Sequence, residues 1–388
     1  MIADPLTVLA AATLVVAAVL AVRLAVGQGS LGRLEDAEPV PAEEARHVSI
    51  VVAARNEARH VAAAVRTLLA QDYPDFEVVV VDDRSDDGTG EILDGLRDRR
   101  RSDRRAELRV LHVSTLPDGW LGKNHALQRG AEAATGDLLL FTDADVLMAP
   151  DAVGRAVGWL EREQLDHLAV APRLHAGGPL AASAVAVFLV AFSTFFRPWR
   201  ARDPRSRAHI GIGAFNLVRA TAYRAIGGHR PIAMRPDDDV RLGARLKGAG
   251  FRQAALVGHD GVAVEWYPSL RAMARGLRKN TFAVVDYRLS LVVAGTALPV
   301  LFAFWPVLAL LLTDGPTRWL NAAVVLLGVL TVADTAHGHR LPRWVGPAYP
   351  LGAALLLWMV WSAALRATLS GGIEWRGTRY GLEELRRG

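Results

Sequence analysis

The chain has 388 residues, 51% of them hydrophobic, with a formal net charge of +5 and no cysteine. The lack of cysteine excludes disulfides, thiolate-bound zinc and a thiol nucleophile. Much of the positive charge is arginine, including a run from Arg97 to Arg105 that contains no aromatic residue, so we expect no nucleic-acid partner. A solvated surface explains this run, and contact with anionic membrane lipids is the alternative.

An uncharged apolar run opens the chain at Leu6–Val22. It approaches the roughly 20 residues that cross a bilayer, and it lacks the basic segment that precedes the apolar core of a signal peptide. We therefore expect a transmembrane anchor at residues 1–26 and a linker rich in Glu, Pro and Ala within residues 27–47. Arginines follow the run at positions 23, 33 and 46. The positive-inside rule then places the next domain in the cytoplasm, at the plasma membrane.

Residues 48–288 alternate between apolar runs of strand length and helical segments. The runs of Val and Leu lack polar alternation, which is typical of parallel strands covered by helices on both faces. The segment therefore predicts an α/β fold. Strands are expected at Val48–Ala54, Phe76–Val81, Leu108–Val113 and Leu138–Phe141, and helices at Glu57–Gln71, from Thr89, at Lys123–Ala134 and at Val240–Lys247.

More apolar runs lie in and after this domain. We interpret the run at about 180–196 as a helix in the membrane interface and residues 289–370 as membrane helices at Leu289–Leu312, Trp319–Ala333 and Pro350–Leu369. The middle helix is short and is expected to be tilted or re-entrant. If all four segments outside the domain cross, both termini lie outside, yet the tail at 371–388 is basic, which favours the cytoplasm. One of the four segments is then expected not to cross, and the sequence leaves open which one.

The first two candidate site residues follow predicted strands. Glu57 comes just after the first strand and Asp83 ends the second. Ligands of open α/β sheets bind beyond the carboxyl ends of the strands, where a carboxylate can accept hydrogen bonds from a nucleobase or a ribose. We predict that Glu57 and Asp83 bind a nucleotide. A helix cap explains neighbouring Asp86 and Asp87 better than ligand binding does.

A third signal is the pair Asp143 and Asp145 at the end of the fourth strand. Alternate residues of an extended segment point the same way, so both carboxylates can face one site. Mg²⁺ and Mn²⁺ prefer oxygen ligands and bind together with substrate phosphates through one or two carboxylates. The pair therefore predicts a site for Mg²⁺ or Mn²⁺ on the diphosphate of a nucleotide.

The fourth signal is the acidic triple at 237–239. Adjacent carboxylates repel one another, so at least one pKa should rise, which suits a general base. We therefore predict a general base among these three residues. A helix N-terminus also favours acidic residues, and Asp239 can open the following helix while it faces the site. Three cations complete the predicted site: Lys123 near phosphates, and Arg275 and Arg278 on the diphosphate or on lipid headgroups.

Taken together, these residues resemble glycosyltransferase family 2, over about Val48 to Tyr287. The resemblance implies an α/β GT-A fold, a Rossmann-like nucleotide-sugar-binding domain, here with transmembrane α-helices at both ends. It implies that Asp143-Ala144-Asp145 is the metal-binding motif, that Glu57 and Asp83 contact the nucleotide, and that Asp238-Asp239 is the catalytic pair with Asp239 as base.

Three further motifs resemble the carotenoid-glycosylating branch of the family. They are Gly119–Ala126, Ala225–His229 and Gly372–Tyr380. The implied donor is UDP-glucose, and the implied acceptor is an apolar lipid, a carotenoid carboxylate or hydroxyl. Processive members carry Gln-x-x-Arg-Trp, which Arg275–Lys279 lacks, so we expect transfer of a single sugar. The resemblance to the family implies that this transfer inverts the anomeric carbon. The alternatives are another lipid acceptor (hopanoid, diacylglycerol or polyprenyl phosphate), a processive polysaccharide synthase, and a non-catalytic nucleotide-sugar-binding membrane protein.

Overall fold

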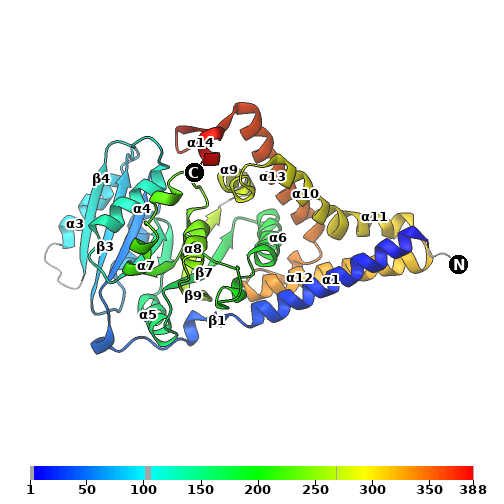
Figure 1. Cartoon of the computed structure of the whole chain (residues 1–388), viewed down its shortest axis with the longest axis horizontal. Helices are drawn as coiled ribbons and strands as arrows, with labels where there is room; N and C mark the ends of the chain where they lie inside the picture. Colours follow the sequence, from blue (N-terminus) through cyan, green and yellow to red (C-terminus); the bar gives the residue numbers. More distant parts are fainter. Residues whose placement is uncertain (1–3, 101–105, 268, 388) are drawn as a thin grey trace.

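One mixed sheet organises the domain in the computed structural model, which describes residues 4–100, 106–267 and 269–387 (Figure 1). In these residues the sheet has nine strands in the order β1-β9-β7-β8-β5-β2-β3-β4, with β6 beside β9. The strands are β1 (Gly32–Arg33), β2 (Val48–Ala54), β3 (Phe76–Asp83), β4 (Glu107–Val113), β5 (Leu138–Asp143), β6 (Val146–Met148), β7 (His167–Ala176), β8 (Asn216–Arg219) and β9 (Gln253–Tyr267).

The strands predicted from the sequence are present, and β5-β2-β3-β4 are parallel as expected. The sheet also contains strands that the sequence did not predict and that make it mixed: β8 runs antiparallel to β5 and β7, and β6 runs antiparallel to β9. The segment Ile210–Ala214, which leads into β8, lies at the cavity beyond the carboxyl end of β5. Strand β5 ends at that edge, whereas β8 starts there and runs away from it. The two strands are therefore antiparallel.

Helices cover both faces of the sheet, as the unbroken apolar strands predicted. On one face Ile50 and Val52 pack with α2, α3 and α5. On the other face Val51 packs with α4, α7 and α8. The six helices are α2 (Val61–Leu69), α3 (Thr89–Arg100), α4 (Gly122–Ala133), α5 (Ala152–Arg162), α7 (Ala220–Ala225) and α8 (Asp238–Gly248).

Helix α2 begins at Val61, four residues later than predicted. Asn56 has a positive φ of 54°, and its side-chain oxygen accepts a hydrogen bond from the backbone N–H of Asp86 at 3.0 Å. The backbone N–H of Glu57 donates to the Thr89 hydroxyl at 2.8 Å. These bonds tie the residues after β2 to the loop after β3, and so keep them out of the helix.

Five helices in the described residues are long and apolar enough to cross a membrane. The segment predicted to be short is instead α12, a helix of 24 residues. Its ends contain polar residues such as Arg318 and Asp334, which hid its length. The apolar elements are α1 (Pro5–Gly29), α6 (Pro179–Phe196), α10 (Leu289–Pro299), the π-helical turn Val300–Phe304, α11 (Trp305–Leu312), α12 (Gly315–Gly338) and α13 (Tyr349–Ser370).

The chain after the last apolar helix folds back onto the domain. It forms a hairpin of β10 and β11 followed by a short helix, α14. Ile373 and Tyr380 of the hairpin are buried in one cluster with Leu121 and Phe282. The sequence predicted only a basic tail here. The remaining elements are β10 (Gly372–Trp375), β11 (Thr378–Gly381), α14 (Leu382–Arg387), α9 (Leu270–Thr281) and 3₁₀ turns at Leu34–Asp36, Ala42–Glu44, Pro198–Arg200, Arg230–Ile232, Ala283–Val285 and Arg343–Val345.

Candidate active site

Three neighbouring strand ends meet at one edge of the sheet. In the register, Ala53 of β2 pairs with Asp143 of β5, and Ala54 pairs with Asp82 of β3. The acidic residues that end β3 and β5 and the polar residues that follow β2 therefore lie at the same level. They line a cavity of about 1800 Å³. All of the predicted site residues whose side chains are described line this cavity, namely Glu57, Asp83, Lys123, Asp143, Asp145, Asp238, Asp239 and Arg275.

The Asp83 carboxylate is buried and already paired. Arg84 donates two hydrogen bonds to it, at 2.7 and 2.8 Å, and Arg55 lies 3.6 Å away. A Cβ at Gly122 would lie 2.3 Å from Asp83 Oδ2, so glycine lets the start of α4 approach this corner. Neither arginine was predicted as a site residue from the sequence, although Arg84 directly follows Asp83 and Arg55 lies two residues before Glu57. Their charges leave this corner able to take an anionic nucleotide.

Lys123 lies between the two acidic groups of the site. Its Nζ is 2.8 Å from Asp143 Oδ1 and 3.4 Å from Asp238 Oδ2. Burial alone would lower the pKa of Lys123, but the charges of Asp143, Asp238 and Asp239 together raise it above its usual range. The ammonium group therefore stays charged and links the strand end of β5 to the start of α8.

Asp237 serves a different purpose from the other two members of the acidic triple. It is 6% exposed, and it accepts hydrogen bonds from Arg235 at 2.9 and 3.1 Å and from Arg241 at 2.9 Å. A buried carboxylate held by two guanidinium groups is not free to accept a proton from a substrate. The candidates for a base are therefore Asp238 and Asp239.

The Asp239 side chain is half-buried and faces the cavity. Its Oδ2 accepts a hydrogen bond from the backbone N–H of Gly213 at 2.7 Å. A Cβ at Gly211 would lie 1.8 Å from the carbonyl oxygen of Asp239, so glycine allows this close packing on α8. Burial and the charge of Asp238 raise the pKa of Asp239 to about 7, although Lys123 opposes the shift. A carboxylate with such a pKa is suited to general base catalysis near neutral pH.

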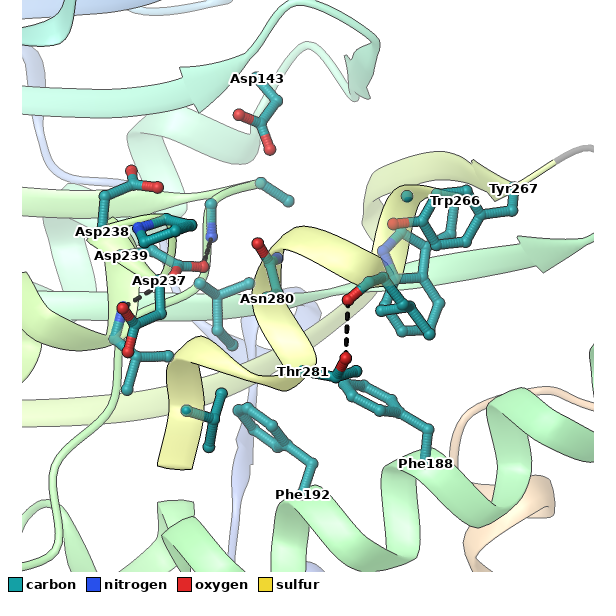
Figure 2. Close-up of a pocket in the computed structure, with 18 of the residues that line it drawn as sticks. Asp143, Phe188, Phe192, Asp237, Asp238, Asp239, Trp266, Tyr267, Asn280 and Thr281 are labelled. Atoms are coloured by element: carbon teal, nitrogen blue, oxygen red, sulfur yellow. Dashed lines mark hydrogen bonds between the residues drawn. The ribbon is translucent and has the colours of Figure 1, made fainter. Parts of the chain in front are cut away.

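Aromatic side chains form the other end of the same cavity. Phe188 and Phe192 project from α6, with Phe188 4.7 Å from Trp266 between ring centroids. Figure 2 shows Asp143 across the cavity from Asp238 and Asp239, and the two phenylalanines rising towards α9. Helix α13 adds Leu356 and Val360. The cavity therefore passes from a charged end to an apolar end.

Two cations were predicted on α9. Arg275 lines the cavity and is exposed. The side chain of Arg278 lies outside the described residues. The structure therefore brings Arg275 to the site, and its contact with diphosphate or with lipid headgroups stays a prediction.

Arg376 also lines the cavity, and the sequence did not predict it as a site residue. It lies between β10 and β11 and donates to Glu57 Oε1 and to the carbonyl oxygen of Arg55, each at 2.5 Å. These partners are about 320 residues away in the chain, so no local sequence pattern predicts the contact. The motif Gly372–Tyr380, noted only for its resemblance, was the one available signal.

We expect the substitution Arg376→Ala to raise the KM for the nucleotide-sugar about fivefold and to change kcat little. The ion pair with Glu57 is half-exposed, and such pairs contribute about 1 kcal/mol, where 1.4 kcal/mol is tenfold. Initial rates at varied donor concentration measure the effect. Arg379→Ala is the matched control, since Arg379 is in the same hairpin but donates to the Ser370 carbonyl instead. Equal KM values for the two variants would contradict the expectation.

Comparison with known sequences identifies the domain. Residues 49–227 match the family model described as Glycosyl transferase family 2. These residues form a family 2 glycosyltransferase domain. The match covers β2 to the end of α7, and thus the strand ends that carry Glu57, Asp83, Asp143 and Asp145.

Two curated relatives of the family 2 domain are similar to this chain over part of its length. Beta-monoglucosyldiacylglycerol synthase of Trichormus variabilis is 35% identical over 120 residues, which are 30% of this chain and 24% of the relative. The 4,4'-diaponeurosporenoate glycosyltransferase of Staphylococcus aureus is 25% identical over 229 residues, 57% of this chain and 56% of the relative. The chain thus spans less than two thirds of either relative.

A solved structure shares the fold of the whole chain. It is the mannosyltransferase PcManGT from Pyrobaculum calidifontis in complex with GDP-Man and Mn²⁺. It has a TM-score of 0.54 and 21% sequence identity, and the match covers 94% of this chain and 99% of that one. The family 2 domain therefore has the GT-A fold that the sequence predicted, joined to apolar helices.

The donor set at Asp143 and Asp145 fits a divalent cation. Burial, and then the charges of Asp143 and Glu57, raise the pKa of Asp145 to about 6, so negative charge at this point is in excess. Among the described residues no three His, Asp or Glu side chains converge as a complete ligand set. Mg²⁺ and Mn²⁺ suit this arrangement, because they usually take one or two carboxylates and complete their shell with water and substrate phosphates.

Proposed function

We propose that the chain transfers a single hexose from a UDP-sugar, with glucose preferred, to a membrane lipid acceptor with inversion at the anomeric carbon. One observation carries the proposal: the acidic strand ends and the aromatic wall line the same cavity. Transfer from a charged donor to an apolar acceptor needs a cavity of this kind, in which a charged end and an apolar end are continuous. The family 2 domain supports the class of reaction.

The donor occupies the edge of the sheet in this proposal. Glu57 and Asp83 seat the nucleoside, and Arg275 approaches the diphosphate. Asp143 and Asp145 hold Mg²⁺ or Mn²⁺, which supplies Lewis-acid stabilisation of the departing diphosphate when bound. Lys123, charged between the acidic groups, orients Asp143 and adds positive charge beside the phosphates.

The acceptor occupies the apolar end. Its reactive oxygen reaches Asp239, which takes the proton from a hydroxyl while the oxygen attacks the anomeric carbon from the face opposite the diphosphate. Gly213 N–H holds the carboxylate in place during this step. A carboxylic acid acceptor is already ionised, so it needs the base less.

The relatives favour two kinds of acceptor. One relative is named for diaponeurosporenoate, a carotenoid acid, and another for diacylglycerol. A carotenoid carboxylate or hydroxyl is our first candidate, because three motifs of the sequence resemble that branch. Diacylglycerol is the second candidate, and the similarity to the synthase supports it.

We also propose that the protein is a multi-pass protein of the plasma membrane with its catalytic domain in the cytoplasm. The proposed division has an anchor at 1–26, a linker at 27–47 that adds β1 to the sheet, the catalytic domain at 48–288, membrane helices at 289–370 and a basic tail at 371–388 that folds onto the domain. Five long apolar helices support the membrane location, and the arginines after the first helix support the orientation.

Membranes that contain the protein, incubated with labelled UDP-glucose and Mn²⁺, test the proposal. We expect one labelled lipid that extracts into organic solvent and whose mass exceeds that of its acceptor by one hexose. A labelled polymer would indicate a processive synthase. Unchanged UDP-glucose in the presence of both candidate acceptors would contradict the proposal.

We expect Phe192→Ala to raise the KM for the lipid acceptor about tenfold and to leave the KM for UDP-glucose unchanged. Truncation removes a ring from the apolar wall, and burial of a Phe side chain is worth about 1.5–3 kcal/mol. Kinetics in detergent with varied acceptor measure the effect. Leu180→Ala, a truncation on the same helix at an exposed residue that does not line the cavity, is the control. An unchanged acceptor KM in Phe192→Ala would mean that the acceptor lies elsewhere.

A further inference from the structure

Helix α6 leaves the sheet and returns to it. It follows β7 and precedes β8, and these two strands are paired neighbours in the sheet. A helix whose two ends join adjacent strands on one side of a bilayer has not crossed it. Despite its length and apolar composition, α6 therefore lies on the side of the catalytic domain.

Three other apolar helices connect the domain to a distant end of the molecule. At that end Thr7 of α1 and Thr317 of α12 lie 2.6 Å apart between their hydroxyl oxygens, and α11 passes into α12 through Thr313 and Asp314. At the other end α1 leads into β1, α10 follows the domain, and Arg340 after α12 pairs with Asp260 of β9. Helices of 24 or 25 residues are about 36 Å long, enough for the roughly 30 Å hydrocarbon core.

Helix α13 differs from these three, because the chain is already at the domain before it and is at the domain again after it. His339, the residue that caps the end of α12, lies 3.3 Å from His259 of β9. After it, Arg376 bonds to Glu57, and Arg386 donates to the carbonyl oxygen of Tyr287 at 3.0 Å. Figure 1 shows the carboxyl terminus beside α9 and far from the amino terminus.

The start of α13 reaches the middle of the helix bundle. The Tyr349 hydroxyl donates to the carbonyl oxygen of Phe302 at 3.4 Å, and its ring lies close to Gly328, near the centre of α12. The segment after α12 thus returns part of the way along that helix, and α13 runs back from there to the domain.

We infer that three of the five apolar helices in the described residues cross the bilayer, namely α1, α10–α11 and α12. Helices α6 and α13 enter it from the side of the catalytic domain and return. This arrangement removes the conflict in the sequence, since it places the basic tail on the same side as the domain and identifies α13 as the segment that does not cross.

The paired helices α6 and α13 then form a surface that fits one leaflet of the membrane. They pack closely, since a Cβ at Gly352 would lie 2.5 Å from the carbonyl oxygen of Ser183. Trp358 and Leu365 of α13 are 54% and 45% exposed and lie outside the cavity, while Phe188 of α6 and Val360 of α13 face it. With the proposed function, this means that the acceptor is drawn from the leaflet on the side of the domain.

Single cysteines in this cysteine-free chain test the topology without any need for sugar transfer. Three exposed positions report on the three regions: Arg129→Cys on the domain, Asp314→Cys between α11 and α12, and Glu384→Cys on the tail. A membrane-impermeant maleimide is applied to intact cells and to inverted vesicles. A permeant maleimide shows that each cysteine can react. Unchanged affinity for UDP–Mn²⁺ shows that each variant is folded.

We expect Arg129→Cys and Glu384→Cys to react only in inverted vesicles, and Asp314→Cys only in intact cells. Labelling of Glu384→Cys in intact cells, as for Asp314→Cys, would show that α13 crosses and would overturn the inference. His337→Cys, at the end of α12, should be labelled only in inverted vesicles, as Arg129→Cys is. If it is labelled only in intact cells, as Asp314→Cys is, α12 does not cross. A protein that transfers no sugar but shows the expected labelling would overturn the proposed function alone.

Discussion

The substitution Asp143→Ala is expected to lower metal-dependent turnover of UDP-glucose at least about 100-fold. Lewis-acid stabilisation of a leaving diphosphate is worth several kcal/mol, and about 1.4 kcal/mol is tenfold in rate. Asp143 ends β5, and its carboxylate is held beside Lys123 at 2.8 Å. Its loss removes one of the two proposed protein ligands for the cation, and it also removes the partner of the Lys123 ammonium.

The measurement is the rate of UDP release as Mn²⁺ is titrated. Asp86→Ala is the matched control, because Asp86 also follows a strand of the same edge but lies in an exposed turn outside the cavity. Its rate should equal that of the wild type. If Asp143→Ala keeps more than a tenth of the activity with the same Mn²⁺ dependence, the cation is held elsewhere.

The substitution Asp239→Asn is expected to lower kcat for an alcohol acceptor by about 10²–10⁴-fold, the usual contribution of a general base. The amide oxygen can still accept the Gly213 N–H bond, so the fold should be kept, while the group no longer takes a proton. UDP–Mn²⁺ affinity should be unchanged. Asp238→Asn separates the two candidates, and the larger loss in kcat identifies the base.

The same carboxylate predicts the pH dependence of the wild type. Burial raises the pKa of Asp239 to about 7, and the base must be deprotonated to act. Activity with an alcohol acceptor should therefore rise with pH through about 7 and fall below it. In Asp239→Asn this limb should be absent. A wild-type profile that is flat from pH 5 to 8 would argue against Asp239 as the base.

Much of this site could be predicted because local sequence determines it. An apolar strand that runs directly into acidic residues indicates which strand ends face a ligand, and β2, β3 and β5 are placed accordingly. The acidic triple stands at the start of α8 as expected. The pattern could not show that Asp237 is paired with Arg235 and Arg241, because the pairing depends on the orientation of those side chains in the folded protein.

The parts that were missed depend on contacts between distant segments. Strand β8 has four residues, too few for a pattern, and its direction follows from where the preceding segment lies. Arg376 reaches Glu57 only because α13 returns the tail to the domain. The membrane topology was ambiguous for the same reason, because hydropathy measures the length of a helix and not where its ends lie.

The most direct test is a crystal of the protein soaked with UDP-glucose and Mn²⁺ and measured at a wavelength where manganese scatters anomalously. We expect a single strong peak within bonding distance of carboxylate oxygens of Asp143 and Asp145 and of the donor diphosphate. A manganese peak bound to other residues, with both aspartates turned away from the diphosphate, would show that this metal site is wrong.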